Sequence, residues 1–304
     1  MDCRFLSTFV LATLLVGFDA WADTLDLSDP EDALLASRKV QCSLEDGVPT
    51  ILSWSGRVYS HVSGVADTHL FDTEAFSVRQ CKTYRDTTRG LGYRIVAREV
   101  ILFLDPTTGN ILRSWNNPWT GESLEVMHVA NDPMAPPFPF YAMSADGEAH
   151  EFEGTVMGDL VSVTNEKVLF YESPLGGDFQ PFVGGHYHAY EVFQFFVPTD
   201  ELLDRTISDV STLSMSNARF GPWMPWMKMG GRPGHLIFQG AGRKLGSFEE
   251  LPALLKTEVR TNYSAFENPP SLDDTRPMAN SLVRFKTEME ARQADQSNPT
   301  LNPR

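Results

Sequence analysis

From Thr50 onward, the chain alternates apolar and polar residues at every second position, in runs separated by turn residues. A period of two is typical of β-strands, because successive side chains on a strand point to opposite faces. Such runs lie at residues 51–62, 123–132, 150–173, 186–198 and 234–240. Residues 93–115 indicate a hairpin, since Pro106 and Gly109 supply the backbone conformations that its turn needs.

These runs predict a mainly β chain, folded as an antiparallel β-barrel or sandwich of calycin-like type. A few helices are expected to flank it. One begins at Pro30 after the N-cap residue Asp29, and another near the C-terminus places Leu282, Phe285 and Met289 on one face. No composition shift divides the chain, so we expect one β-rich domain over residues 23–295 and a frayed tail over 296–304.

Residues 1–22 have the pattern of a secretory signal peptide. Arg4 precedes an apolar run at residues 5–17, and Ala20-Trp21-Ala22 matches the small-x-small cleavage pattern. We therefore expect a periplasmic or secreted protein with no stable membrane insertion after cleavage. Export leaves Cys42 and Cys81, which can pair in an oxidising compartment or serve as two small buried apolar residues.

The charge balance and the missing motifs exclude several function classes. The 304 residues hold 25 Lys and Arg against 40 Asp and Glu, a net charge of −15, whereas a nucleic-acid binder needs a basic surface. The patterns GxSxG, GxxxxGK[ST], GxGxxG, HExxH and CxxC do not occur. The sequence thus predicts no cofactor and no nucleic-acid partner, and it leaves the oligomeric state open.

The run at residues 123–132 contains the first catalytic candidates. His128 shares a face with apolar neighbours and is predicted to point inward, with Asn131 and Asp132 just downstream. A histidine near a carboxylate can form an acid–base pair, because imidazole titrates near neutral pH. Glu99 is a further acid or base. The alternatives are a core histidine with satisfied hydrogen bonds and an outward, ion-paired Glu99.

Residues 218–238 form the segment richest in Trp and Met. Two prolines oppose a regular helix there, so the segment is predicted to be a shaped apolar loop. Trp223, Trp226 and Met227 are candidates for one wall of a hydrophobic pocket, with Arg232 as the anchor for an anionic group. The alternative is a plug that seals one end of a barrel.

His186 and His188 share one face of the run at residues 186–198, as two ligands of one metal ion must. The segment resembles the HxH…E core of cupins, which implies a divalent metal. However, Glu191 follows too soon and is expected on the opposite face, beside Phe193 and Phe195. The alternative is a polar strand whose histidines face water.

Two long segments, at residues 97–133 and 218–244, resemble the family of domain of unknown function 1838, and residues 191–198 resemble its middle section. The similarity runs from about residue 38 to residue 290. It implies a fold shared with bacterial, often exported, proteins and brings no catalytic roles. The matching positions are Glu99, Trp115, Asn117, Asn131, Asp132, Trp223, Trp226, Arg232 and Gly234.

Three functions fit these patterns. The first is a cofactor-independent lyase, isomerase or cyclase that binds a hydrophobic small molecule in an aromatic-lined pocket and uses acid–base residues. The second is a non-catalytic periplasmic carrier of such a ligand. The third is a cupin-like metal enzyme that uses His186 and His188.

Overall fold

The computed structural model describes residues 24–175, 179, 182 and 185–297. The predicted signal peptide and residues 298–304 of the predicted tail lie outside them. The helices are α1 (Pro30–Gln41), α2 (Thr199–Leu203), α3 (Ala253–Asn262) and α4 (Ser281–Ser297), with 3-10 turns η2 (Pro225–Met227), η3 (Phe248–Glu250) and η4 (Ser264–Glu267).

The described residues form one 10-stranded antiparallel sheet in the order β6-β3-β2-β1-β12-β11-β10-β9-β8, with β7 also paired to β3, and a separate pair β4-β5. The strands are β1 (Thr50–His61), β2 (Thr68–Asp86), β3 (Gly90–Leu104), β4 (Ser114–Asn116), β5 (Ser123–Glu125), β6 (Val129–Asn131), β7 (Phe140–Tyr141), β8 (Gly154–Met157), β9 (Leu160–Glu172), β10 (His186–Pro198), β11 (Ser214–Gly221) and β12 (His235–Leu245). This architecture confirms the predicted mainly antiparallel β fold.

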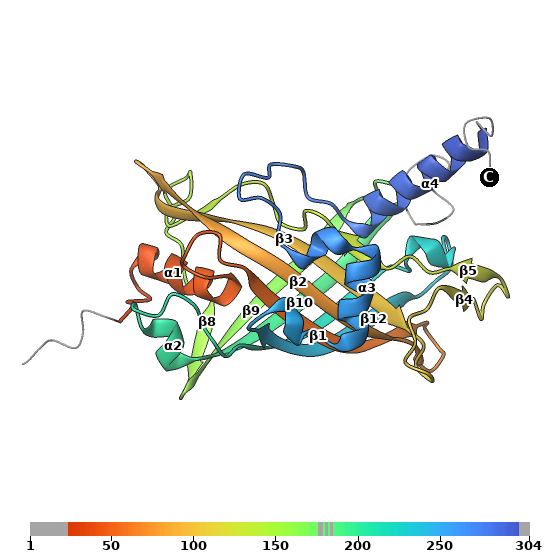
Figure 1. Cartoon of the computed structure of the whole chain (residues 1–304), viewed down its shortest axis with the longest axis horizontal. Coiled ribbons are helices and arrows are strands. Elements are labelled where there is room, and N and C mark those ends of the chain that lie inside the picture. Colours follow the sequence, from red (N-terminus) through yellow and green to blue (C-terminus); the bar gives the residue numbers. More distant parts are fainter. Residues whose placement is uncertain (1–23, 176–178, 180–181, 183–184, 298–304) are drawn as a thin grey trace, which may run out of the picture.

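The long strands twist and curl, so that β2 and β3 cross in front of β9 and β10 (Figure 1). The sheet is not closed, yet its curl encloses one face, which we call the interior. Phe71 of β2, Phe103 of β3 and Tyr187 of β10 belong to a single core cluster although they lie on widely separated strands of the sheet. The two edges of the curled sheet, at β3 and β9, face each other across a gap, at the position where a closed barrel would pair its first and last strands.

Apolar layers fill the two ends of the interior and cover part of its outside. At one end, α1 and α2 pack on interior residues such as Leu52, Trp54 and Phe195. At the other, η2 and α4 pack on Phe71 and Phe103. Leu282 and Phe285 of α4 are buried and Met289 packs against the same cluster, as the helical spacing predicts. On the outer face, α3 covers a third cluster. Apolar burial of this kind is the main source of stability in a domain of this size.

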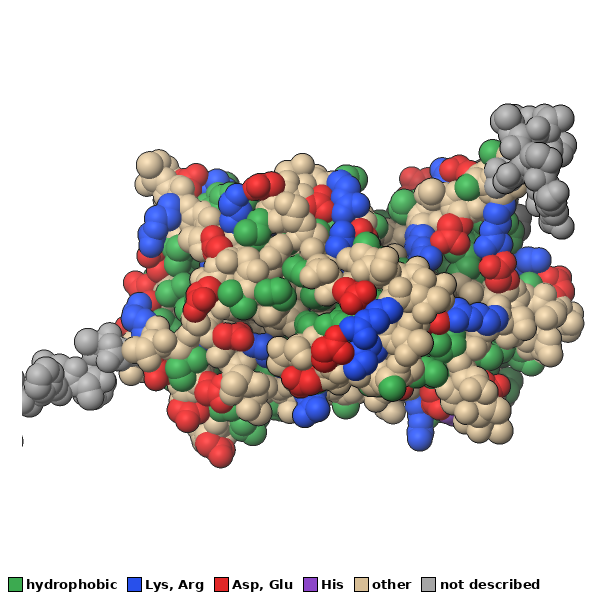
Figure 2. Space-filling view, viewed as in Figure 1, with side chains coloured by type: hydrophobic (Ala, Val, Ile, Leu, Met, Phe, Trp, Pro, Cys, Tyr) green, Lys and Arg blue, Asp and Glu red, His purple; other side chains and the backbone are tan. Residues whose placement is uncertain are grey.

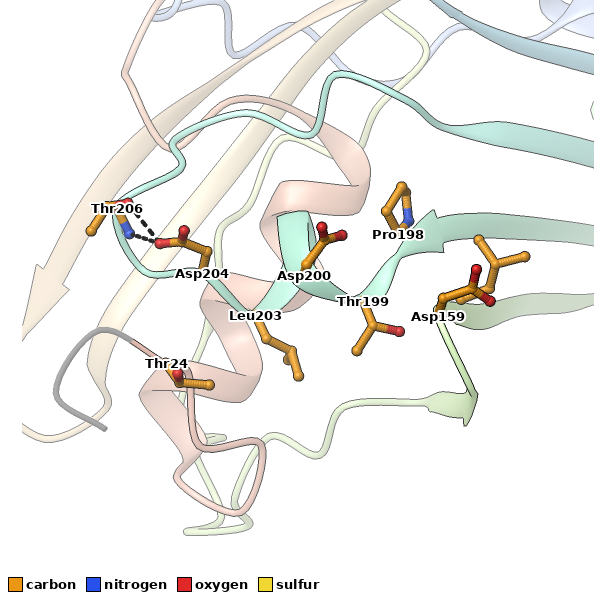
Figure 3. A pocket seen from close by; sticks show the side chains of 9 residues that line it. Thr24, Asp159, Pro198, Thr199, Asp200, Leu203, Asp204 and Thr206 are labelled. Atoms are coloured by element: carbon orange, nitrogen blue, oxygen red, sulfur yellow. Dashed lines mark hydrogen bonds between the residues drawn. The ribbon is translucent and has the colours of Figure 1, made fainter. Parts of the chain in front are cut away.

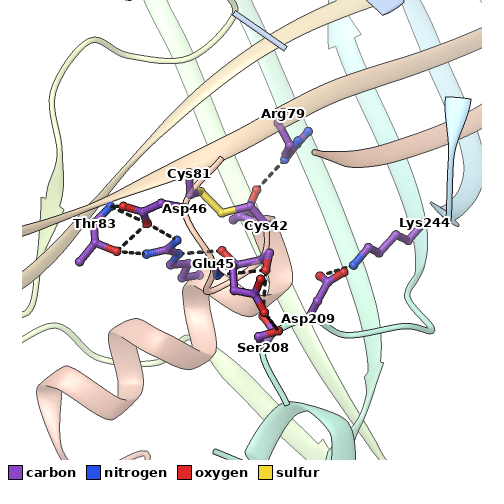
Figure 4. The surroundings of a disulfide bond; sticks show 12 residues. Cys42, Glu45, Asp46, Arg79, Cys81, Thr83, Ser208, Asp209 and Lys244 are labelled. Atoms are coloured by element: carbon purple, nitrogen blue, oxygen red, sulfur yellow. Dashed lines mark hydrogen bonds and ion pairs between the residues drawn. A yellow bond between two sulfur atoms is a disulfide. The ribbon is translucent and has the colours of Figure 1, made fainter. Parts of the chain in front are cut away.

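A disulfide joins the C-terminal end of α1 to β2, between Cys42 and Cys81, whose Cα atoms lie 6.1 Å apart. Figure 4 shows the bond surrounded by polar contacts. Arg38 of α1 forms an ion pair of 2.9 Å with Asp46, which also accepts hydrogen bonds from Thr83 of β2. The sequence left two alternatives open for these cysteines, and the structure shows that they pair, so that the end of α1 is fixed to β2.

One predicted strand is wrong. Residues 123–132 form two strands, β5 and β6, because β5 pairs with β4 in the small sheet whereas β6 joins β3 at the edge of the main sheet. The chain changes direction between them at residues 126–128. Because His128 lies in this bend, the alternation expected on a single strand does not determine which way its side chain points.

Acidic and basic side chains lie interspersed on the face shown in Figure 2, over α3 and the strands beside it. Several of them form exposed ion pairs, such as the pair between Arg260 of α3 and Glu249. Among the described residues, the longest helices lack the apolar length that crossing a lipid bilayer requires.

Reduction of the disulfide is expected to lower the free energy of unfolding by roughly 3 kcal/mol, because the bond closes a loop in the unfolded chain. Its two cysteines are 39 positions apart. Urea unfolding of the Cys42→Ala/Cys81→Ala variant, compared with the wild type with and without reductant, measures the difference. Equal unfolding midpoints for the oxidised wild type and the variant would contradict this prediction.

Candidate functional site

The middle layer of the interior differs from the two apolar ends. Register pairing places Glu99 opposite Ser77 and Asn131, and Glu191 opposite Arg219 and Lys167. Paired residues on antiparallel strands point to the same face. We call Glu99, Asn131, Tyr187, Glu191 and Arg219 the interior polar cluster.

Members of this cluster retain accessible surface although they point inward. The Glu191 and Arg219 side chains keep 20% and 21% of their surface. Glu99 and Asn131 are likewise only partly buried, whereas Phe71, Phe103 and other residues toward the ends are fully buried. The accessible surface of these side chains indicates that unfilled space adjoins them inside the curled sheet.

An ion pair organises one side of the cluster. The Nε atom of Arg219 lies 2.8 Å from the Glu191 carboxylate, and the Nη2 atom of Arg219 donates a hydrogen bond to the Tyr187 hydroxyl. Because the Tyr187 oxygen accepts from Arg219, its own proton is free to be donated elsewhere. Buried charge pairs are costly to desolvate, and the ion pair with Glu191 together with the Tyr187 contact offsets that cost for Arg219.

Glu99 occupies the other side of the cluster. Its carboxylate accepts a hydrogen bond of 3.1 Å from the Asn131 amide. Burial raises the pKa of Glu99, and the negative charge of Glu191 raises it further, while Asn131 and the more distant Arg79 oppose the shift. The Oδ1 atom of Asn131 is buried and has no hydrogen-bond partner among the described residues. A buried acceptor without a partner is typical of a position where a ligand or water binds.

A cavity of about 1190 Å³ lies at the gap between β3 and β9, and its lining comes close to the interior polar cluster without including any of the five cluster residues. Ala97, two positions before Glu99, and Lys167, the register partner of Glu191, both line it. Further lining comes from α1 and from the segment that contains β7, including Gln41, Met134 and Phe140. The cavity therefore reaches a position two residues before Glu99 and the register partner of Glu191.

Two other cavities lie on the outside. One of about 860 Å³ is lined by Asp159, Asp200 and Asp204 beside α2 (Figure 3). Its carboxylates point in different directions, and Asp204 is hydrogen-bonded to Thr206. The other, of about 900 Å³, crosses the outer face of β1, β12 and β11. No group of three His, Cys, Asp or Glu side chains within the described ranges has the arrangement of a metal site.

The structure does not bring His128 and Asp132 together. Asp132 forms ion pairs of 3.0 Å with Arg98 and 2.7 Å with Arg276, at the outer side of the sheet. His128 is buried, and its Nδ1 accepts a hydrogen bond of 3.1 Å from the Phe103 backbone N–H. No hydrogen bond or ion pair links the two residues in the described part of the chain. His128 is enclosed in the core, with its Nε2 buried and without a hydrogen-bond partner among the described residues, whereas Glu99 and Asn131 lie side by side.

Trp223, Trp226 and Met227 are buried in the core cluster that closes one end of the interior. Trp226 contacts the rings of Phe71 and Phe103, with centroids 5.8 Å away in each case. The segment is thus packed as a plug, and none of these three side chains lines the 1190 Å³ cavity. Arg232 is exposed on the following turn and does not line that cavity either.

His186 and His188 are exposed on the outer face of β10, where both rings contact Phe170 of β9 at 5.1 and 5.5 Å. Glu191 points to the interior instead, as expected from the spacing. The two histidines and Glu191, the nearest carboxylate on β10, therefore lie on opposite faces of the sheet.

Glu191, Arg219 and Tyr187 were not predicted as site residues. The signal was present in the sequence, since Glu191 shares a face with Phe193 and Phe195. A single acid on an otherwise apolar strand face indicates a buried charge that needs a partner. Which cation it meets depends on the pairing of β10 with β11, and strand pairing is not encoded locally.

We predict that titration of Glu99 will show a pKa above the ordinary value for glutamate, and that Glu191→Gln will lower it. The substitution removes a like charge and frees Arg219 to act on Glu99. Carboxyl ¹³C NMR, assigned by comparison with Glu99→Gln, measures the pKa. Glu249→Gln, exposed beside α3 and outside the lining of the 1190 Å³ cavity, is the control and should leave it unchanged. An unshifted Glu99 in the wild type would refute the assignment.

We predict that the buried His128 makes the folded protein less stable in mild acid. Burial, with the charge of Arg113, lowers the pKa of His128 to about 4. Because the unfolded chain takes up this proton first, the stabilisation is complete above the ordinary pKa of histidine and is lost as pH falls toward 4. Between pH 7 and pH 5 the wild type should lose about 2 kcal/mol more than His128→Asn. Urea unfolding at both pH values measures this, with His186→Asn as the exposed control. Parallel losses in the wild type and His128→Asn would contradict the prediction.

Comparison with known protein families identifies a sequence model that matches most of the chain. Residues 47–289 match the sequence model of the family described as "Protein of unknown function (DUF1838)". No curated protein is significantly similar. The matched span contains every strand of the main sheet, the interior polar cluster and the loop that plugs its end. The resemblance seen in the sequence is thereby confirmed, and the chain belongs to the DUF1838 family.

Proposed function

We propose that the interior polar cluster is the active site of a cofactor-independent acid–base enzyme, a lyase, isomerase or cyclase acting on a small molecule with an apolar body. One observation carries the proposal: Glu99 is held inside the curled sheet, beside open space, with its pKa raised by burial and by Glu191. Enzymes raise the pKa of a glutamate in this way to make it an effective acid or base near neutral pH.

The geometry supports a proton transfer. In its ionised form, Glu99 takes a proton from a substrate carbon next to a carbonyl group, and the C–H electron pair remains on the substrate as an enolate. The Tyr187 hydroxyl, held by Arg219, can donate a hydrogen bond to the enolate oxygen. Glu99 then returns the proton to another carbon, which gives an isomer, or a leaving group departs, which gives a lyase reaction.

We also propose that the protein acts in the periplasm or outside the cell. The signal-like residues 1–22 support this location, and so does the Cys42–Cys81 bond, because disulfides persist in oxidising compartments. A non-catalytic carrier in the same compartment would use the same cavity without proton transfer.

Deuterium exchange tests the chemistry without knowledge of the full reaction. We expect the wild type in D₂O to exchange carbon-bound protons in members of a panel of cyclic ketones and β,γ-unsaturated carboxylic acids. Glu99→Gln should slow the exchange at least 100-fold, because the base is lost while the shape is kept. Proton NMR of the panel compounds measures the rate.

Glu249→Gln, exposed beside α3 and outside the lining of the 1190 Å³ cavity, is the matched control and should exchange at the wild-type rate. Exchange by Glu99→Gln at the wild-type rate would refute the role of Glu99. Binding of panel compounds by the wild type with no exchange would favour the carrier.

A further inference from the structure

Arg79 of β2 is a cation inside the curled sheet that pairs with no carboxylate in the described residues. Its register partner is Ala97, two positions from Glu99, and it lines the 1190 Å³ cavity. Its guanidinium donates to two neutral oxygens, Oε1 of Gln41 at 2.8 Å and Oγ of Ser77 at 3.1 Å, while its Nε is buried without a partner. Arg219, on the opposite side of the interior, has Glu191 as its ion-pair partner.

A buried cation without an ion-pair partner is energetically unfavourable. Burial lowers the pKa of Arg79 to about 10, so the group is still charged at neutral pH. Glu99 acts on it at longer range but forms no ion pair with it. A buried charge is normally paired, and an arginine offers a planar fork that fits a carboxylate. The missing partner is therefore expected to be an anion supplied from the cavity.

The disulfide holds this arginine in place. Gln41 immediately precedes Cys42, and Arg79 lies two positions before Cys81, so the bond between the cysteines joins the two segments that carry the hydrogen-bonded pair. Figure 4 shows Arg79 directed toward α1 beside the bridge. Because the crosslink restrains the two segments that hold Arg79, this side chain loses little conformational entropy when it binds a ligand.

The walls of the cavity are suited to an apolar body. Tyr93, Ile95 and Phe140 line it, and Phe138 at its mouth is 59% exposed. The acidic members of the lining, Glu148, Glu151, Glu153 and Glu166, are all exposed, so water screens their charge more than that of Arg79.

We propose that the cavity binds an amphipathic organic anion, whose carboxylate pairs with Arg79 while its apolar body lies against Tyr93, Ile95 and Phe140. This inference names the substrate class of the proposed active site and so rests on the proposed function. Ser77, which accepts from Arg79, is the register partner of Glu99. A carboxylate bound at Arg79 therefore places its neighbouring carbon atoms toward Glu99.

Calorimetric titration with two matched pairs of probes tests the proposal: decanoate against 1-decanol, and 1-naphthoate against 1-naphthalenemethanol. The wild type is expected to bind at least one acid tenfold or more tightly than its alcohol. Arg79→Gln should lose this preference and keep its affinity for the alcohol. Arg57→Gln, on the outer face, is the matched control and should keep it.

A second variant keeps the test independent of how well Arg79→Gln folds. Gln41→Glu has nearly the same shape and supplies Arg79 with an internal carboxylate, so it should also remove the preference for the acids. Equal binding of acids and alcohols by the wild type, no binding of either, or an unchanged preference in both variants would overturn the proposal. Glu99→Gln should retain acid binding, so a failure of catalysis and a failure of anion binding give different results.

Discussion

The curl of the main sheet encloses one face of every long strand, and each polar group on that face must find its partner inside the protein. Most of the enclosed positions meet this constraint with apolar side chains, as Trp54, Phe71 and Phe195 do at the two ends. The middle layer instead contains Glu99, Glu191, Arg79 and Arg219. Charges in such a place cost free energy unless they are paired, so their presence there requires an explanation beyond folding.

The four charges are not equivalent. Glu191 and Arg219 form an ion pair of 2.8 Å, and Arg219 also donates a hydrogen bond to Tyr187, so the charges in this half of the layer compensate each other. Glu99 and Arg79 have only neutral hydrogen-bond partners, Asn131 on one side and Gln41 and Ser77 on the other. They influence each other without forming an ion pair. A carboxyl and a guanidinium left apart in this way can each act on a third group placed between them.

The sequence predicted what depends on local pattern and missed what depends on strand pairing. The period of two predicted the antiparallel β fold, and the helical spacing of Leu282, Phe285 and Met289 predicted the buried face of α4. Glu99 and Asn131 were named from their residue types, and they do lie together. The partnership of Glu191 with Arg219 depends on β10 lying beside β11, and that of Arg79 with Gln41 on how α1 meets β2.

His128 shows the opposite failure, because its surroundings looked functional in the sequence. Asp132 lies four residues after His128 in the chain, but the strand is broken between β5 and β6. Asp132 also directly follows the inward-pointing Asn131, so its side chain points to the outer face, away from His128.

The plug and the helices decide how the middle layer can be reached. Trp223, Trp226 and Met227 seal one end of the interior, and α1 with α2 covers the other. Access is left through the gap between β3 and β9, where the 1190 Å³ cavity opens. A molecule entering there meets the apolar residues of the mouth before it meets Arg79. For the organic anion that we propose as ligand, the residues rich in Trp and Met close the far end of the interior, so that its route of entry leads past Arg79.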